Sequence, residues 1–453
     1  MQISKKILFS SVFSVCAALL AQQKAYAKAG DLDAMFGVGG FVSLPTLGAE
    51  DTKNLSAVAV QADGKILFGA STLIAGGSGV GLTIGRLMPN GSLDASYGSA
   101  GIRSLLPAVH DSQLAVPTRL IYSPTGDAYL LSGSVDVYSP QIFKINLDGV
   151  MDTSFGINGV ATPPNCEVIS CDIEAMRIDN QGRLLVAGVY QTANVSKIYL
   201  ARLNENGQPD LSFNVTGQAD LPQVDASHTA IIQDVNISID NKIVLTGAVL
   251  PVTYVATPPG GAYISRLNSD GSLDNSFASN GVFISILHNR SASDAKVLAD
   301  GSILVTGALG KQSDASINPR SGLSVWKLTS AGVMDSTFGD HGSAYLPGAG
   351  DNYALRIATS SNGKILISGS HNSKGALARF TPQGAVDTSY GAGGVSYVGN
   401  AAAIYDMALQ ADDKAVSVKG YSDTDGVYRT KGGALSVLGI SLFGLLFRRR
   451  AVG

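Results

Sequence analysis

Charged side chains of opposite sign recur along this chain at one fixed spacing. Arg or Lys precedes Asp by eight residues in six copies: Arg86 and Asp94, Lys144 and Asp152, Arg202 and Asp210, Arg266 and Asp274, Lys327 and Asp335, Arg379 and Asp387. Such charges could hold a metal or an acidic partner, but a pair that occurs once per repeat usually stabilises the repeat. An aspartate in a turn caps backbone N–H groups, and the basic residue can reach it across the hairpin. We therefore predict a structural role for these pairs.

Histidines and acids in the segments that join one repeat to the next are the candidates for binding. His110 lies beside Asp111, His228 follows an acidic segment, and His288 precedes Arg290. If these segments lie on one rim of the fold, the side chains form a polar funnel for a ligand or ion, together with Glu50, Asp51 and Asp351. The alternative is a set of scattered, solvent-exposed polar residues.

Two cysteines outside the N-terminal segment, Cys166 and Cys171, have four residues between them. A disulfide is the first interpretation for such a pair in an exported protein, and two free thiols are the alternative. Zinc is disfavoured because neither cysteine has a second Cys or His at ligand spacing. The chain also has no nucleophile elbow, HExxH or Walker phrase, so no cofactor is predicted.

These residues lie in a sequence that repeats along the chain. The sequence motif around the shared aspartate occurs seven times with a mean period of 59 residues. Two of its copies are GSLDASYGSAG, which begins at Gly91, and GVMDSTFGDHG, which begins at Gly332. A second phrase alternates apolar and polar residues around an Asp-Gly or Asn-Gly turn, which predicts a β-hairpin. The aromatic residue after each aspartate is interpreted as a packing plug between repeats. These aromatic residues are Phe36, Tyr97, Phe155, Phe213, Phe277, Phe338 and Tyr390.

The two ends of the repeat region complete each other. Arg429 has no aspartate eight residues later, and Asp33 has no hairpin before it. Six full units and one split unit are typical of a seven-bladed β-propeller in which the N-terminal strand pairs into the last blade. An open solenoid is the alternative, but it would need two distinct polar caps. We predict an all-β fold with one propeller domain over residues 28–431.

The repeats resemble the delta-60 repeat, with its DGK-I-x-x-x-G hairpin and its R-L-x-x-x-G-x-x-D-x-S-F-G signature. Three copies depart from the pattern: Asn214 and Ala278 replace the glycine after the aromatic residue, and Asp413 replaces the hairpin glycine. We expect slightly different turns there. The resemblance implies a propeller in an exported bacterial protein and implies no particular biochemical activity.

Residues 1–27 have the pattern of a secretory signal. Lys5 and Lys6 precede an apolar helical stretch from Ile7 to Leu20, and a small-x-small motif ends at Ala27. Fourteen apolar residues are too few for a membrane span, so we expect signal peptidase to cleave after Ala27 and the chain to be exported.

Residues 432–453 form a second short apolar segment, predicted to be helical. It begins with Gly432 and Gly433 and ends in the cluster Arg448 to Arg450, which favours an arginine end on the cytoplasmic side. This tail resembles the GlyGly-CTERM sorting signal. The resemblance implies cleavage near Gly432 and Gly433 by a rhombosortase, followed by surface display or release. An uncut tail would tether the protein to the inner membrane, in the periplasm.

Composition narrows the class of function. The net charge is −3 and only 15% of residues are charged, so no basic surface for nucleic acid is expected. We expect a non-enzymatic scaffold that binds a protein or glycan at the cell exterior, with the insertion 248–263 as a specificity loop. The alternative is a secreted hydrolase or lactonase with a metal in the central channel, which predicts metal-ligating side chains at equivalent inward positions of several blades.

Overall fold

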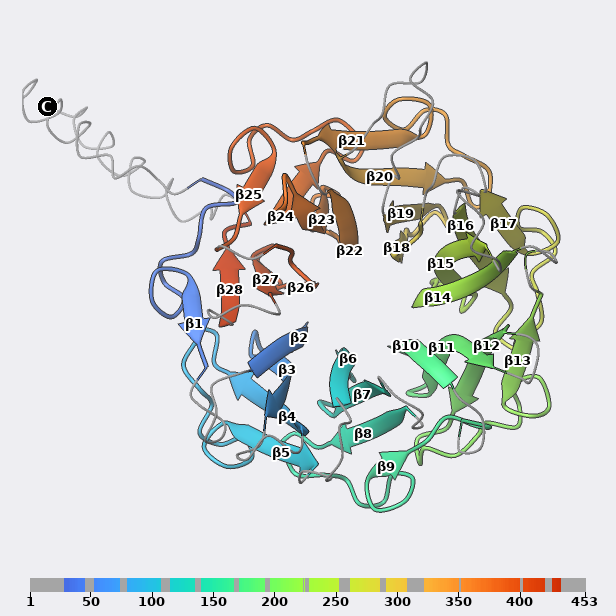
Figure 1. Cartoon of the computed structure of the whole chain (residues 1–453), viewed down its shortest axis with the longest axis horizontal. Helices are drawn as coiled ribbons and strands as arrows, with labels where there is room; N and C mark the ends of the chain where they lie inside the picture. Colours follow the sequence, from blue (N-terminus) through green and yellow to red (C-terminus); the bar gives the residue numbers. More distant parts are fainter. Residues whose placement is uncertain are drawn as a thin grey trace, which may run out of the picture.

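The computed structural model describes residues 28–432 except for the gaps 45–52, 74–79, 107–114, 135–139, 167–170, 192–195, 223, 225–227, 252–260, 286–290, 308–321, 350–351, 400–401 and 420–425. The described residues form seven four-stranded antiparallel sheets arranged around a centre, as Figure 1 shows. The predicted all-β, seven-bladed propeller is confirmed. The predicted helical ends, residues 1–27 and most of 432–453, lie outside the described residues.

Each blade runs from an inner strand at the centre to an outer strand at the rim. Blade 1 has β2 (Lys53–Val60), β3 (Ile66–Leu73), β4 (Val80–Leu87) and β5 (Ile102–Leu106); blade 2 has β6 (Ala115–Tyr122), β7 (Ala128–Ser134), β8 (Gln141–Ile145) and β9 (Val160–Ala161); blade 3 has β10 (Cys171–Ile178), β11 (Leu184–Gln191), β12 (Ser196–Leu203) and β13 (Gln218–Leu221).

The remaining blades follow the same order. Blade 4 has β14 (His228–Ile237), β15 (Ile243–Pro251), β16 (Gly261–Leu267) and β17 (Val282–Ser285); blade 5 has β18 (Asp294–Val297), β19 (Ile303–Gly307), β20 (Gly322–Leu328) and β21 (Ser343–Pro347); blade 6 has β22 (Tyr353–Thr359), β23 (Ile365–His371), β24 (Lys374–Phe380) and β25 (Val395–Tyr397); blade 7 has β26 (Asp406–Leu409), β27 (Ala415–Val418), β28 (Gly426–Thr430) and β1 (Phe41–Ser43).

Blade 7 joins the two ends of the repeat region. Its outer strand β1 pairs antiparallel with β28, with Phe41 opposite Tyr428. The backbone N–H of Asp33 donates to the carbonyl of Arg429 at 2.8 Å. Figure 1 shows β1 beside β28 although they lie at opposite ends of the domain sequence. The predicted closure by the N-terminal strand is confirmed.

The predicted aromatic plugs are buried between blades. All seven are at most 2% exposed. A Cβ added to Gly91 would lie 3.1 Å from the Phe36 ring, and one added to Gly149 would lie 3.0 Å from the Tyr97 ring. Each of these glycines belongs to the next blade and has positive φ, so close approach and backbone conformation both require glycine. The repeated glycines and aromatics therefore interlock successive blades.

All three residues that depart from the repeat keep the left-handed backbone conformation of the glycine they replace. Asn214 has φ of 47° and Ala278 has φ of 45°, close to the 56° of Gly98 at the equivalent position. Asp413 likewise has φ of 61° where the hairpin of blade 1 has glycine. The expected change of turn occurs at Asn214, where the next residue, Val215, also has positive φ, of 66°. It does not occur at Ala278, which is followed by positive φ at Asn280 just as Gly98 is followed by positive φ at Ala100.

Candidate functional site

All seven repeated acid–base pairs form. Each of the six pairs within a blade has a distance of 2.7 to 3.0 Å between the basic nitrogen and the aspartate Oδ2. The seventh pair joins Arg429 of β28 to Asp33 of the N-terminal segment, with Nη2 2.8 Å from Oδ2. Both of those side chains are buried. The structural role predicted for the pairs is thus realised, and the last one helps to close the ring.

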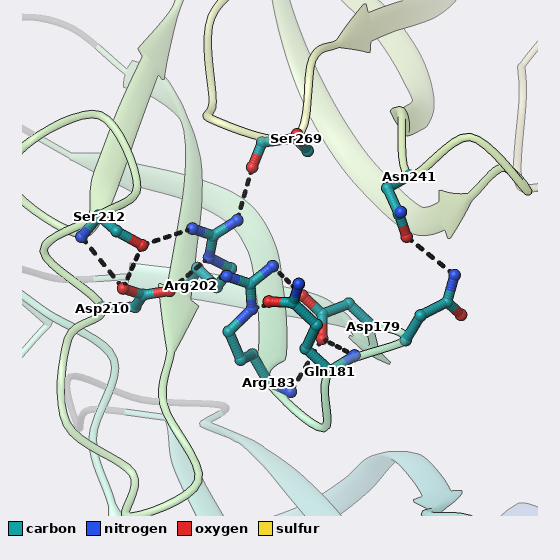
Figure 2. A network of polar contacts seen from close by, with 9 residues as sticks. Asp179, Gln181, Arg183, Arg202, Asp210, Ser212, Asn241 and Ser269 are labelled. Atoms are coloured by element: carbon teal, nitrogen blue, oxygen red, sulfur yellow. Dashed lines mark hydrogen bonds and ion pairs between the residues drawn. The ribbon is translucent and has the colours of Figure 1, made fainter.

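Figure 2 shows how one pair connects two blades. Arg202 donates from Nε to Asp210 Oδ2 at 2.8 Å and from Nη1 to the carbonyl of Ser269, in the next blade, at 2.5 Å. Asp210 Oδ1 accepts the backbone N–H of Ser212 at 3.0 Å and its hydroxyl at 2.7 Å. The aspartate therefore caps the turn while the arginine fastens the neighbouring blade.

A second cation approaches the shared aspartate from the hairpin turn, and our sequence analysis missed it. The residue after the turn is basic in five blades and lies 2.6 to 3.5 Å from that aspartate: Lys65, Arg183, Lys242, Lys364 and Lys414. Burial is the largest influence on five of the seven aspartates and opposes ionisation, but hydrogen bonds and cations outweigh it. The pKa of all seven is lowered.

The predicted histidine funnel falls mostly outside the described residues. His110, Asp111, His288 and Arg290 lie there, as do Glu50, Asp51 and Asp351. His228 opens β14 opposite Pro251 and is partly buried. Within the insertion 248–263, the first four residues extend β15, the last three begin β16, and the rest lies outside. The funnel and the specificity loop stay predictions.

The predicted disulfide joins Cys166 to Cys171, with Cα atoms 5.4 Å apart. Of the predicted processing residues, Ala27 and Gly433 lie outside the described part of the chain. Gly432 lies inside it, and its carbonyl accepts a hydrogen bond from Arg379 Nη1 at 2.6 Å. A Cβ at Gly432 would lie 2.2 Å from the carbonyl oxygen of Asp413, so the fold itself requires glycine at this position.

The central channel is the strongest candidate site in the described structure, and the inner strands build it in three layers. Five inner strands carry a β-bulge, which places two successive side chains toward the centre or the next blade. We call the first of these positions the bulge layer and the second the ring layer, and we include the equivalent residues of the other two blades. The bulge layer consists of Ser56, Thr118, Glu174, Gln233, Ser293, Leu355 and Tyr405. The wall layer lies two residues after the ring layer. Figure 1 shows the first strand of each blade facing the centre of the ring.

The ring layer links blades by polar contacts around the channel. It consists of Ala57, Arg119, Ala175, Asp234, Asp294, Arg356 and Asp406. Asp406 accepts the backbone N–H of Val58, in the next blade, at 2.8 Å. Asp294 accepts that of Ile357 at 2.9 Å, and Arg356 Nε donates to Asp406 at 3.0 Å. These bonds brace one blade against the next.

Arg119 crosses the small side chain of the third blade to reach the fourth. Its Nη2 lies 2.5 Å from the carbonyl oxygen of Gln233 and 3.4 Å from Asp234 Oδ1. Asp234 also accepts a hydrogen bond from Asn236. The ring layer therefore forms a nearly continuous chain of contacts, and it separates the channel into two chambers.

Burial perturbs the channel carboxyls in the direction opposite to the repeated aspartates. Burial, followed by the nearby Asp234 carboxylate, raises the pKa of Asp294 well above its usual value. Burial raises the pKa of Asp406 to about 6, partly offset by Arg119. Burial and then Asp172 raise the pKa of Glu174, in the bulge layer. The channel thus favours neutral carboxyls more than the blade turns do.

The two chambers differ in size and lining. The smaller, about 220 Å³, is lined by all seven residues of the bulge layer, including Glu174 and Tyr405. It lies toward the ends of the inner strands where the blade-to-blade connections enter. The larger chamber, about 450 Å³, is lined by all seven residues of the wall layer. These are Ala59, Ile121, Arg177, Asn236, Lys296, Ala358 and Ala408.

The wall layer has two chemically different sectors. Blades 3, 4 and 5 contribute Arg177, Asn236 and Lys296 side by side, whereas the other four blades contribute only alanine or isoleucine. Arg177 donates from Nη2 to Asn236 at 2.9 Å and from Nε to the carbonyl of Val235 at 3.0 Å. The larger chamber therefore combines a cationic sector with an apolar one, a lining typical of small-molecule sites.

The carboxylates of the ring layer can be compared with the ligands that the alternative function, a metal in the central channel, would need. Asp234, Asp294 and Asp406 occupy equivalent positions of three blades, as that alternative predicts. Among the described residues, however, no three His, Cys, Asp or Glu side chains come close enough together to hold a metal ion. The described residues also contain no helix able to cross a membrane.

One signal in the sequence could have identified these layers. Each ring residue precedes the residue of positive φ in its hairpin turn by seven positions, from Ala57 and Gly64 to Asp406 and Asp413. Aligning the repeats on the hairpin therefore aligns the channel. Alternation alone does not find it, because the bulge shifts the period of two within the strand.

Comparison with known families agrees with the propeller repeat. Four segments, 61–97, 182–213, 240–277 and 360–390, match a beta-propeller domain of unknown function, DUF5122. Each match extends from a hairpin turn, or just before it, to the aromatic plug of the same blade. A comparison with curated proteins gave no significant match.

Comparison with solved structures found matches at low sequence identity. Virginiamycin B lyase from Staphylococcus aureus, a catalytically inactive variant with quinupristin, aligns with a TM-score of 0.51 at 10% identity, covering 86% of this chain and 98% of the lyase. The beta-propeller domain of the trilobed protease from Pyrococcus furiosus aligns at 0.44 and 11% identity, covering 84% and 94%. The first likeness is one of fold alone, and the chain is a β-propeller repeat protein.

Proposed function

We propose that this propeller is an exported, non-enzymatic scaffold that binds a partner at the cell exterior, either a protein or a glycan, and holds a small ligand in its channel. The repeats resemble the delta-60 repeat, and the tail resembles a GlyGly-CTERM signal. Cleavage by signal peptidase after Ala27 and by a rhombosortase near Gly433 would release or display the propeller on the cell surface.

The proposal rests on the hydrogen bonds and ion pairs that the channel carboxylates make with neighbouring blades. Asp294 and Asp406 accept backbone N–H groups of neighbouring blades, and Asp234 lies against Arg119. These groups are committed to bracing the ring, so they are poorly placed to act as general bases. The larger chamber beside them offers both polar and apolar surface, which suits binding without chemistry.

The proposed processing is compatible with the end of the fold. Strand β28 ends at Thr430, and Gly432 makes the last described contact, with Arg379. A cut between Gly432 and Gly433 would leave blade 7 intact. Fractionation of the native cells followed by intact-mass measurement tests this step. A mass that retains Arg448 to Gly453 would instead place the protein on the inner membrane, facing the periplasm.

The alternative, a metal-dependent hydrolase or lactonase, defines the functional test. Protein recovered from its own cells is incubated with a panel of esters and lactones, with Ca²⁺ or Zn²⁺ and with EDTA, and products are measured by mass spectrometry. We expect no turnover under any condition, and native mass spectrometry should detect non-covalent adducts with unchanged small molecules. Any turnover would overturn the non-enzymatic scaffold proposal, and turnover that EDTA abolishes and metal restores would support the metal-dependent alternative.

A further inference from the structure

The charged side chains that line the larger chamber indicate what kind of ligand it could hold. Its wall layer places two cations, Arg177 and Lys296, on either side of Asn236. Arg177 is satisfied by Asn236, by the carbonyl of Val235 and, at 3.8 Å, by Asp234. Within the described residues, no carboxylate forms an ion pair with Lys296. Lys296, which is exposed to the chamber, is therefore a cation with no ion-pair partner among the described residues.

The charges around this lysine do not supply one. Desolvation in the channel, then the nearby Arg177, lowers the pKa of Lys296, and the nearby Asp294 partly offsets this shift without forming an ion pair. Asp294 is the nearest acid by chain position, but its carboxyl oxygens accept the N–H groups of Ala295 and Ile357. Asp406 is bonded to Arg356 and Val58. Asp234 lies between Arg119 and Arg177. The chamber holds an excess of positive charge although the chain as a whole is acidic.

The opposite wall has no polar side chain in the wall layer. Ala59, Ala358 and Ala408 leave open volume there, and Ile121 completes the apolar sector. A volume of about 450 Å³ accepts a small organic molecule rather than a single ion. An apolar body would lie against the alanines while an oxyanion meets the cationic sector, because each part then keeps the surroundings that it prefers.

We propose that the larger chamber binds a small organic carboxylate with an apolar body, whose carboxylate pairs with Lys296 and Arg177 and whose body packs on Ala358 and Ala408. This inference rests on the proposed binding function and names the class of its ligand. The contacts with Lys296 give affinity for the charge, and the small side chains of blades 6 and 7 set the size of the body.

Calorimetric titration with four probes tests the site. Benzoate and hexanoate carry the predicted combination, benzamide has the body without the charge, and inorganic phosphate has the charge without the body. We expect saturable one-to-one binding of at least one carboxylate, at least tenfold tighter than benzamide or phosphate. Phosphate binding more tightly than both carboxylates would overturn the organic ligand, and absence of carboxylate binding would overturn the site.

Two variants locate the binding, and one serves as a matched control. Lys296→Met keeps the length of the side chain and should weaken carboxylate binding at least tenfold. Ala358→Leu should weaken hexanoate more than acetate, which is titrated here as a carboxylate with a smaller apolar body, because leucine fills the apolar sector. Lys374→Met, on β24 outside the channel, should bind as the parent does. Equal affinity of the parent and Lys296→Met would overturn the proposal, whereas turnover of an ester or lactone would overturn the non-enzymatic scaffold function.

Discussion

A buried ion pair joins the two ends of the domain and supports the closure of the ring. The side chains of Asp33 and Arg429 are 3% and 6% exposed, and two arginine nitrogens lie within 3.0 Å of one carboxylate oxygen. Asp33→Asn keeps the shape and an acceptor for the turn but leaves Arg429 buried with a neutral partner. Removing one member of a buried pair costs about 3–5 kcal/mol. We expect a loss of this size in the free energy of unfolding.

The matched control is the same pair in a covalently continuous blade. Arg379 and Asp387 have the same geometry and similar burial, so Asp387→Asn should cost a comparable amount in urea unfolding. The two variants should differ in hydrogen exchange. Only Asp33→Asn should release β1 from β28. The backbone amides of 426–430 should then exchange about 100-fold faster than in the parent, or more, because each 1.4 kcal/mol of lost stability raises the opening equilibrium constant by a factor of ten.

Two results would refute the role of the pair Asp33 and Arg429 in closing the ring. If both variants raise exchange in β28 equally, the N-terminal pair has no particular role in closure. A cost below about 1 kcal/mol for Asp33→Asn would show that the pair behaves as an exposed one. The double variant Asp33→Asn with Arg429→Met should recover part of the loss, because it removes the unpaired charge as well.

Three further predictions concern the repeated positions. The pKa of all seven shared aspartates is lowered in the fold, so their contribution to stability is present above the unfolded value of about 4 and is lost as pH falls below it. Unfolding by urea should need much less denaturant at pH 3 than at pH 6, and equal midpoints would contradict this. Lys144→Arg should raise stability by about 1 kcal/mol, because Arg86 and Arg202 at the equivalent position each donate to a carbonyl of the next blade and lysine has no second fork nitrogen. An unchanged or lower thermal midpoint would count against the arginine bridge. Ala278→Gly should raise stability by up to about 1 kcal/mol, because alanine at φ of 45° is strained, and Asn214→Gly should raise it less.

The fold could be predicted in detail because each repeated residue has one local task that its spacing reveals. Asp94 caps its own turn, Arg86 lies eight residues before it, and Tyr97 packs against the following blade, so short-range spacing and hydrophobicity were sufficient. The split between Arg429 and Asp33 then implied closure, since no other arrangement completes the seventh pair. Spacing alone did not reveal the second cation, Lys65, because it reaches Asp94 from a different hairpin of the blade.

The channel could not be predicted in the same way. Glu174 and Arg177 lie in one inner strand, yet they face different chambers, because the bulge after Ile173 changes which residues point inward. A strict alternation assigns one of these two side chains to the wrong side of the strand. The polar partners of Arg119 lie more than a hundred residues away, in blade 4, so no local pattern could pair them.

Positions that carry the same residue in every repeat therefore concern the stability of the fold, whereas positions that vary between repeats concern the lining of the channel. A position that carries Asp seven times serves every blade alike, and its substitution should change stability at each site. The ring and wall layers vary from blade to blade, with Asp or Arg facing alanine and with Arg177 and Lys296 on one side only. Seven identical blades would line the channel evenly, so a chamber with a charged side and an apolar side exists only where the repeat is broken. Those breaks are where selective binding can arise, and Lys296 is a break that forms no ion pair with any described residue.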